Sequence, residues 1–175
     1  MKKMLLCLLI IPALAMLSCK TAPATTTASS QPQHKPPQIE GDVTQAKVNQ
    51  ALGQIYDTYR SKLDFTGAQD YVVVKGDTLS QITRKFYGSL TDVGDSGPNN
   101  GFYFPVIMLA SDSNIVDPDF IDPGMALKIV DLKRNLSNPV SRQAIKDCLM
   151  DVSYVYNKKG VKATEDGLIK LANSL

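Results

Sequence analysis

Few side chains in this 175-residue chain could support catalysis. His34 is its only histidine and lies in a Pro-, Ser- and Thr-rich segment, so the sequence predicts neither a histidine-activated nucleophile nor a histidine metal site. Glycan hydrolysis commonly needs two carboxylates, one of them in an apolar pocket. Both glutamates, Glu40 and Glu165, lie in peripheral segments, and the conceivable pair Asp117 and Asp119 lies in a turn expected to be exposed. We therefore predict no enzyme activity, no catalytic residue and no cofactor.

An acidic loop could instead bind a cation. Asp92 and Asp95 lie close to Asn99 and Asn100, and all four side chains carry oxygen ligands. Their spacing is not that of an EF-hand, and no bidentate glutamate follows them. Ordinary loop composition accounts for these residues, so we predict no metal site.

The N-terminal residues have the pattern of an export signal peptide. Lys2 and Lys3 precede an apolar run over residues 4–17, which has the length of a signal-peptide core and is too short to span a bilayer. Met16-Leu17-Ser18-Cys19 resembles a bacterial lipobox, which implies lipidation of Cys19 as the first residue of the mature chain. Cleavage after Ala15, giving an exported protein without lipid, is the alternative. Lys20 in the place of a retention aspartate favours an outer-membrane anchor that faces the periplasm.

Processing at Cys19 bears on both charge and disulfide chemistry. Loss of Lys2 and Lys3 takes the formal net charge from +2 to zero, so no basic patch predicts a nucleic-acid partner. Of the three cysteines, Cys19 and Cys148 remain. A lipidated Cys19 leaves Cys148 unpaired within the chain. We expect Cys148 to pack inside a helix, with an intermolecular or reactive role left open.

A central stretch, residues 71–130, contains the clearest local signals. Residues 71–74 suit a strand, and Gly76-Asp77 suits a turn. Thr78-x-x-Gln81 matches a capping box that begins a helix ending at Gly88. A loop over residues 88–101 follows.

Phe104-Pro105 begins a second short helix in this stretch, because proline is tolerated in the first helical turn. Its buried side is expected to comprise Val106, Ile107, Leu109 and Ala110. Pro123-Gly124 then turns the chain into a returning strand over residues 126–130. The predicted fold is therefore α+β, a two-stranded antiparallel sheet with two helices on one face.

Three more helices are expected around this module. Residues 43–63, 139–157 and 164–175 each show an apolar stripe at helical spacing. Asn138-Pro139 is a typical helix start, and Lys158-Lys159-Gly160 a typical helix end. The predicted organisation is a signal (1–18), a disordered tether rich in Thr, Pro and Ser (19–41), a flanking helix (42–70), the central module (71–131) and a helical extension (132–175).

Residues spread over both ends of the central stretch carry a family resemblance. They are Tyr71-x-Val73, Lys75-Gly76-Asp77-Thr78-Leu79-x-x-Ile82, Phe86-Tyr87-Gly88 and Pro118-Asp119-x-Ile121-x-Pro123-Gly124-x-x-Leu127-x-Ile129. This pattern resembles the LysM domain, a carbohydrate-binding module. The resemblance implies a βααβ fold and non-covalent binding of peptidoglycan. Together with the lipobox at residues 16–19, it predicts a peptidoglycan-binding lipoprotein of the cell envelope. Peptidoglycan, or another glycan that contains N-acetylglucosamine, would be its ligand.

In that family the glycan lies between two loops. The corresponding positions in this chain are Gly76, Asp77, Thr78 and Leu79 in the first loop, and Asn114, Ile115, Val116, Asp117, Pro118, Asp119, Phe120 and Ile121 in the second. Three positions depart from the usual pattern: Ser111 replaces an asparagine, Met125 a glutamine and Phe104 a tryptophan. Ser111 and Met125 keep open an alternative, in which the module is a scaffold for envelope protein partners and binds no glycan.

Overall fold

The computed structural model describes residues 37–88, 100–111 and 116–175, all within one unit that extends from Lys35 to Leu175. The predicted signal, the lipobox, most of the predicted tether and the Asp92–Asp95 loop lie outside the described residues. The elements in chain order are α1 (Gln45–Tyr59), η1 (Arg60–Lys62), β1 (Gln69–Val72), α2 (Leu79–Tyr87), η3 (Asn100–Tyr103), α3 (Phe104–Ala110), β2 (Ala126–Ile129), α4 (Leu132–Ser137), α5 (Pro139–Lys158) and α6 (Lys162–Asn173).

The two strands pair antiparallel, as predicted, with Tyr71 opposite Leu127. β1 begins and ends two residues earlier than expected. The Val73 N–H still donates to the Met125 carbonyl at 2.9 Å, and the Val73 carbonyl accepts from the Gly124 N–H at 2.8 Å. The chain then leaves the ladder toward the turn at Gly76, whose φ of +94° suits glycine. The pairing therefore extends beyond the regular strand.

The predicted capping box begins α2. The Thr78 hydroxyl accepts from the Gln81 N–H at 3.3 Å, and the Gln81 side chain accepts from the Thr78 N–H at 3.1 Å. Both donors would otherwise lack partners at the start of the helix. The helix ends at Tyr87, next to Gly88, which keeps a right-handed φ of −59°. The capping box fixes where the loop of residues 74–78 joins the helix.

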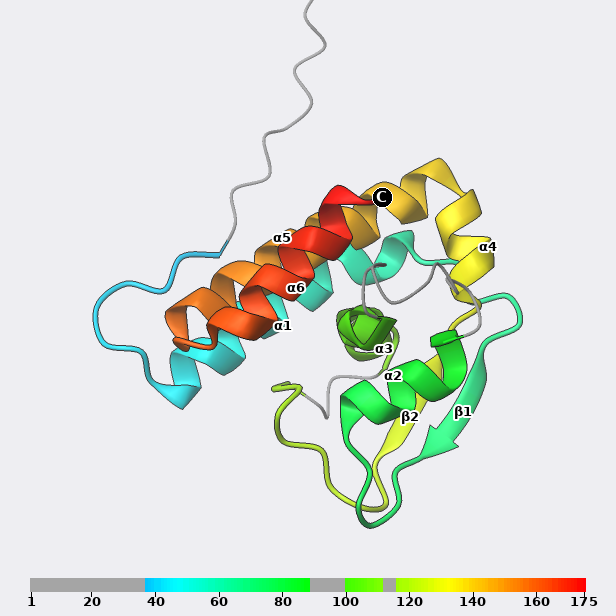
Figure 1. The fold of residues 1–175 in the computed structure, drawn as a ribbon, viewed down its shortest axis with the longest axis horizontal. Coiled ribbons are helices and arrows are strands. Elements are labelled where there is room, and N and C mark those ends of the chain that lie inside the picture. Colours follow the sequence, from blue (N-terminus) through cyan, green and yellow to red (C-terminus); the bar gives the residue numbers. More distant parts are fainter. Residues whose placement is uncertain (1–36, 89–99, 112–115) are drawn as a thin grey trace, which may run out of the picture. The chain divides into compact units, whose positions relative to one another are not determined.

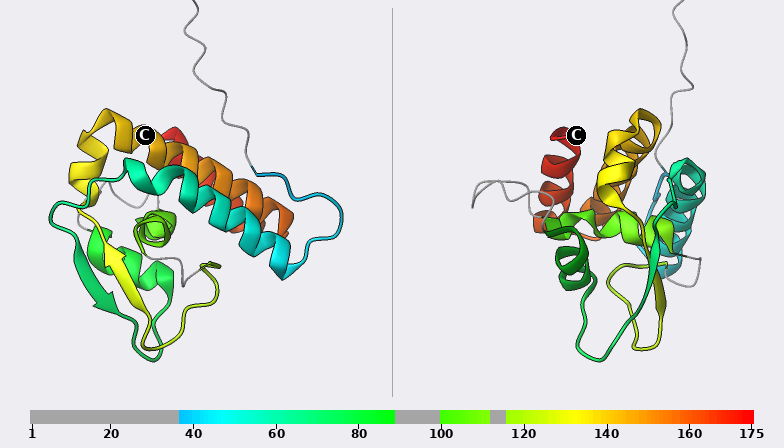
Figure 2. Two further views of the ribbon diagram at one scale, coloured as in Figure 1. Left: turned by 180° about the vertical axis from the view of Figure 1, so that it is seen from behind. Right: turned by 90° about the vertical axis from the view of Figure 1, so that its right-hand side faces the viewer.

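Helix α3 forms the centre of the core. It begins at Phe104-Pro105, as predicted, but all seven of its residues are buried rather than one face alone. Figures 1 and 2 show α3 between the sheet and the layer of α1 and α5. A helix with neighbours on all sides needs apolar residues all round, and its sequence, Phe-Pro-Val-Ile-Met-Leu-Ala, supplies them.

The flanking helices α1, α5 and α6 pack side by side (Figure 2). The apolar stripes predicted for the first two are buried: Val48, Leu52, Ile55, Tyr59 and Leu63 on the α1 side, and Ile145, Cys148, Leu149, Val152 and Tyr156 on α5. Burial raises the pKa of the Cys148 thiol well above its usual range. Cys148 is thus a packing residue. Among the described helices, none is long and apolar enough to cross a bilayer.

Packing begins earlier and involves more helices than expected. Ile39, inside the predicted tether, is buried. With the short helix α4, the described part of the chain has four flanking α-helices instead of three. Its start is capped by Asp131, which accepts from the Arg134 N–H at 3.0 Å. Six residues are too few to show an apolar period, so this helix had no recognisable pattern in the sequence.

Candidate functional site

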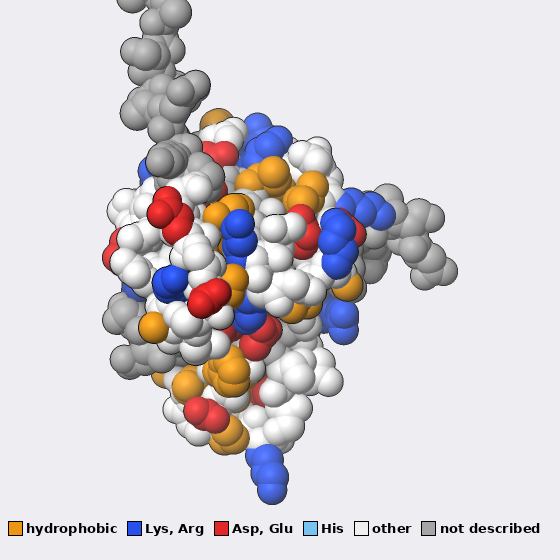
Figure 3. Space-filling view, turned by 90° about the vertical axis from the view of Figure 1, so that its left-hand side faces the viewer, with side chains coloured by type: hydrophobic (Ala, Val, Ile, Leu, Met, Phe, Trp, Pro, Cys, Tyr) orange, Lys and Arg blue, Asp and Glu red, His pale blue; other side chains and the backbone are white. Residues whose placement is uncertain are grey.

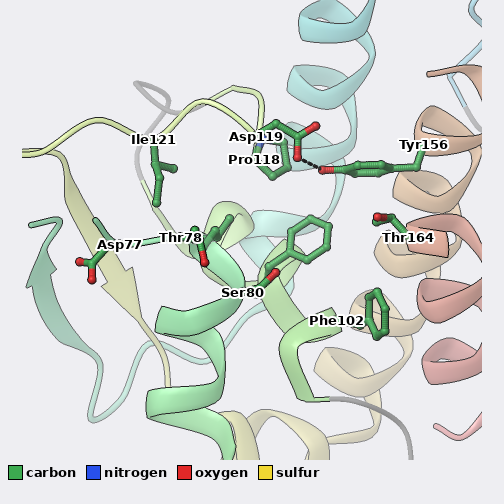
Figure 4. A pocket seen from close by; sticks show the side chains of 11 residues that line it. Asp77, Thr78, Ser80, Phe102, Pro118, Asp119, Ile121, Tyr156 and Thr164 are labelled. Carbon is green, nitrogen blue, oxygen red and sulfur yellow. Dashed lines mark hydrogen bonds between the residues drawn. The ribbon is translucent and has the colours of Figure 1, made fainter. Parts of the chain in front are cut away.

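A cleft of about 300 Å³ lies beside the start of α2 (Figure 4). Its lining residues are Asp77, Thr78, Leu79, Ser80, Phe102, Phe104, Pro118, Asp119, Ile121, Tyr156 and Thr164. These residues form three sides of the cleft. The first side is the start of α2 with the turn before it, and the second is the loop over residues 116–121. The third side consists of residues from 102–104, α5 and α6. Two of these sides were predicted, and the third was not.

Asp77 anchors the first side of the cleft. Its carboxylate accepts hydrogen bonds from the Val74 N–H at 2.9 Å and from the Tyr71 hydroxyl at 2.7 Å. The Val74 amide is the larger cause, and Tyr71 the second, of a pKa below the usual range for an aspartate. Asp77 therefore stays ionised near neutral pH. It holds the turn closed and can accept hydrogen bonds from a ligand.

The second side comprises Pro118, Asp119 and Ile121, but not Asp117. The expectation that this turn is exposed is wrong for Asp117, whose side chain is 3% exposed. Its carboxylate accepts from Lys159 Nζ at 3.0 Å and from Gln45 Nε2 at 2.7 Å. A buried carboxylate needs such partners. Asp117 therefore fixes the loop from within the protein.

Lys159 joins this loop to α5. Its ammonium pairs with both Asp117 and Asp119. Burial alone would lower the pKa of Lys159, but the hydrogen bonds to Asp119 and Asp117 outweigh it, so the pKa is raised. The Tyr156 hydroxyl also donates to Asp119, at 2.9 Å (Figure 4).

Helix α1 holds the other end of the same loop. The Tyr56 hydroxyl donates to the Val116 carbonyl at 3.2 Å. Gln45, at the start of α1, reaches Asp117. The loop is thus bonded from α1 on one side and from α5 on the other.

The third side was missed by sequence reasoning. Phe104 was expected only to begin a helix and to replace a tryptophan of the family pattern, and Phe102 had no predicted role. Tyr156 and Thr164 come from α5 and α6. Tyr156 packs edge-to-face on Phe104, with ring centroids 5.8 Å apart. Ser80, in the first turn of α2, also lines the cleft, although it was not among the predicted ligand residues. Helical periodicity marked Tyr156 as core, and no signal in the sequence links α5 or α6 to the two loops.

The twelve predicted ligand residues separate into three groups. Six line the cleft: Asp77, Thr78, Leu79, Pro118, Asp119 and Ile121. Four others do not: Gly76 and Phe120 are exposed, Asp117 is buried, and the Val116 carbonyl is bonded to Tyr56. Asn114 and Ile115 lie outside the described residues.

Ser111, one of the departures from the family pattern, has a structural role. Its hydroxyl donates to the Ile107 carbonyl at 2.6 Å and accepts from the Lys128 N–H at 2.9 Å. It therefore ties the end of α3 to β2. Ser111 is buried and does not line the cleft.

The lining favours binding over bond cleavage. Because its pKa is lowered, Asp77 is unsuited to the role of a general acid, and Asp119 already accepts from Tyr156 and Lys159. Among the described residues, no three His, Cys, Asp or Glu side chains are placed to hold a metal ion. Apolar rings beside hydroxyls and carboxylates suit an uncharged ligand with both polar and apolar faces. On the face shown in Figure 3, basic and acidic side chains are interspersed, without a surface of one sign.

A comparison with protein-family models matches residues 71–130 to the LysM domain. Searches of curated proteins and of solved structures found no significant match. The matched segment contains both predicted loops and residues 102–104, while Tyr156 and Thr164 lie outside it.

Proposed function

Because this chain is a LysM domain-containing protein, we propose that it binds peptidoglycan, or another glycan containing N-acetylglucosamine, without catalysing a reaction on it. LysM domains are in general modules that bind such glycans. The observation that carries the proposal is the cleft itself. Asp77, Thr78 and Leu79 line it from the first loop, and Pro118, Asp119 and Ile121 line it from the second.

The chemistry of the cleft supports this ligand class. Ile121 and Leu79 offer apolar contact, while Asp77, Thr78 and Asp119 offer oxygen atoms to hydroxyl and amide groups. A single cleft of this size should bind weakly, with a free energy of about −4 to −7 kcal/mol, which corresponds to millimolar to ten-micromolar dissociation constants. Attachment to a nearby surface would raise the effective concentration of the glycan.

Co-sedimentation of the purified full-length chain with insoluble peptidoglycan sacculi tests the proposal. We expect the chain to pellet and soluble N-acetylglucosamine oligomers to release it. Ile121→Ala should weaken binding by about 5–30-fold, since it removes roughly 1–2 kcal/mol of apolar contact. The neighbouring variant Phe120→Ala is the matched control, because Phe120 is 64% exposed and lies outside the cleft.

Two results would contradict the glycan proposal. A folded chain that stays in the supernatant would favour the protein-adaptor alternative. Equal losses in the Ile121 and Phe120 variants would place the binding surface outside the cleft. Circular dichroism of each variant would verify that it is folded.

We also propose that a lipid on Cys19 holds the protein at the cell envelope, in the outer membrane and facing the periplasm. The lipobox resemblance of Met16-Leu17-Ser18-Cys19 and the polar segment after it support this placement. Cys19→Ala should move the protein from the membrane fraction to the soluble periplasmic fraction. Cys148→Ala is the control and should leave the protein with the membrane; membrane association of the Cys19 variant would argue against the lipid.

A further inference from the structure

Part of the cleft lining lies outside the matched LysM segment. Tyr156 and Thr164 lie beyond residue 130, on two helices joined by a short turn. Phe102 lies within the matched segment, yet it packs on α6. The shape of the third side of the cleft therefore depends on the helical extension of this chain.

Gly167 leaves room for the Phe102 ring. A Cβ atom at Gly167, in the middle of α6, would lie 2.1 Å from Cζ of the Phe102 ring, so only glycine fits there without a shift. Glycine within a helix costs about 1 kcal/mol relative to alanine. Gly167 thus lets the ring pack against the helix backbone, while Phe102 remains half-buried and lines the cleft.

Tyr156 shapes the cleft without offering it a free hydroxyl, because that hydroxyl already donates to Asp119. Ser80 and Thr164 differ. Neither side chain hydrogen-bonds to another residue in the part of the chain that the structure describes, and both line the cleft. Their hydroxyls are therefore available to a ligand that contacts Phe102.

The charges beside this side are negative or already paired. Asp77 and Asp119 are carboxylates of the lining, and Lys159 is paired with Asp117 and Asp119. An anionic ligand would meet repulsion here. An uncharged pyranose ring fits better, since its C–H face can stack on an aromatic ring while its hydroxyls bond to short polar side chains.

We infer that Phe102, Ser80 and Thr164 form an additional sugar subsite, which binds one further uncharged ring of the glycan held by the two loops. This inference rests on the proposed glycan binding. It assigns to the helical extension a role in selecting chain length.

Calorimetric titration of the full-length chain with N-acetylglucosamine oligomers of increasing length tests the subsite. Thr164→Val removes one hydroxyl at nearly constant shape and should lower affinity for the longest oligomers by about 3–10-fold, the effect of one hydrogen bond. Phe102→Leu should lower this affinity by about 2–13-fold, because it removes about 0.5–1.5 kcal/mol of stacking. The shortest oligomer with measurable affinity for the wild type should not reach the subsite. Both variants should therefore bind this oligomer with wild-type affinity.

Thr58→Val is the matched control, since Thr58 lies on α1 and its hydroxyl donates to the Gln54 carbonyl. It should bind every oligomer as the wild type does. Unchanged affinity of Thr164→Val at all lengths, or the same loss at all lengths, would overturn the subsite while glycan binding stands. A folded wild-type chain that binds neither oligomers nor sacculi would overturn the proposed function as well.

Discussion

Replacing Lys159 by alanine is expected to lower the free energy of unfolding by about 3 kcal/mol, the lower part of the range for removing one partner of a buried ion pair. The variant would leave the Asp117 carboxylate, 3% exposed, without its cation. We take the lower part of the range because Lys159 is itself 15% exposed and Gln45 still donates to Asp117. Urea denaturation followed by circular dichroism measures the change.

Two further variants test this explanation. Lys158→Ala removes a neighbouring exposed lysine, whose Nζ lies 5.2 Å from the centroid of the Tyr154 ring, and should cost less than about 1 kcal/mol. Adding Asp117→Asn to Lys159→Ala should recover part of the loss, because a neutral amide replaces the unpaired charge. If Lys158→Ala and Lys159→Ala lowered stability equally, the ion pair would not be a determinant of stability.

Asn135→Ala is expected to destabilise the protein by about 2–4 kcal/mol, since it removes three hydrogen bonds and leaves backbone groups without partners. Asn135 is fully buried on α4. Its amide oxygen accepts from the Asp64 N–H at 2.8 Å, and its nitrogen donates to the carbonyls of Asp64 at 2.8 Å and Asp131 at 2.9 Å. The residue thereby joins α4 to the segment before β1. Chemical denaturation again gives the measurement.

The control for this prediction is Asn157→Ala, at an exposed asparagine whose amide bonds to Glu165. It should change the free energy of unfolding by less than about 1 kcal/mol, as for other exposed hydrogen bonds. A result for Asn135→Ala as small as this would mean that water replaces the lost bonds.

The central module could be predicted because its signals are local. The capping box at Thr78, the proline after Phe104 and the turn at Gly124 act within a few residues, and the structure has each of them. The family pattern then related the two ends of the module to each other. The apolar stripes of α1 and α5 were likewise visible as helical periods.

The parts that could not be predicted depend on tertiary contacts. Asp117 resembled an exposed turn residue. Its buried carboxylate is instead satisfied by Gln45 of α1 and by Lys159, the C-cap of α5, which lies 42 residues later in the chain. An Asp117 substitution would therefore test stability more than glycan binding. Phe102 and Thr164 line the cleft because α6 packs against η3, and neither residue type at its position indicates that contact.

The bonds from α1 and α5 to the loop over residues 116–121 have an entropic consequence. Ordering a loop costs about 1–2 kcal/mol per residue, and a loop that is ordered only in the complex deducts this cost from the affinity. Here Tyr56, Lys159 and Tyr156 hold the loop before any ligand arrives. The entropy cost of ordering the loop is therefore part of the free energy of folding and does not reduce the affinity. Even a small cleft with few contacts can then bind its ligand.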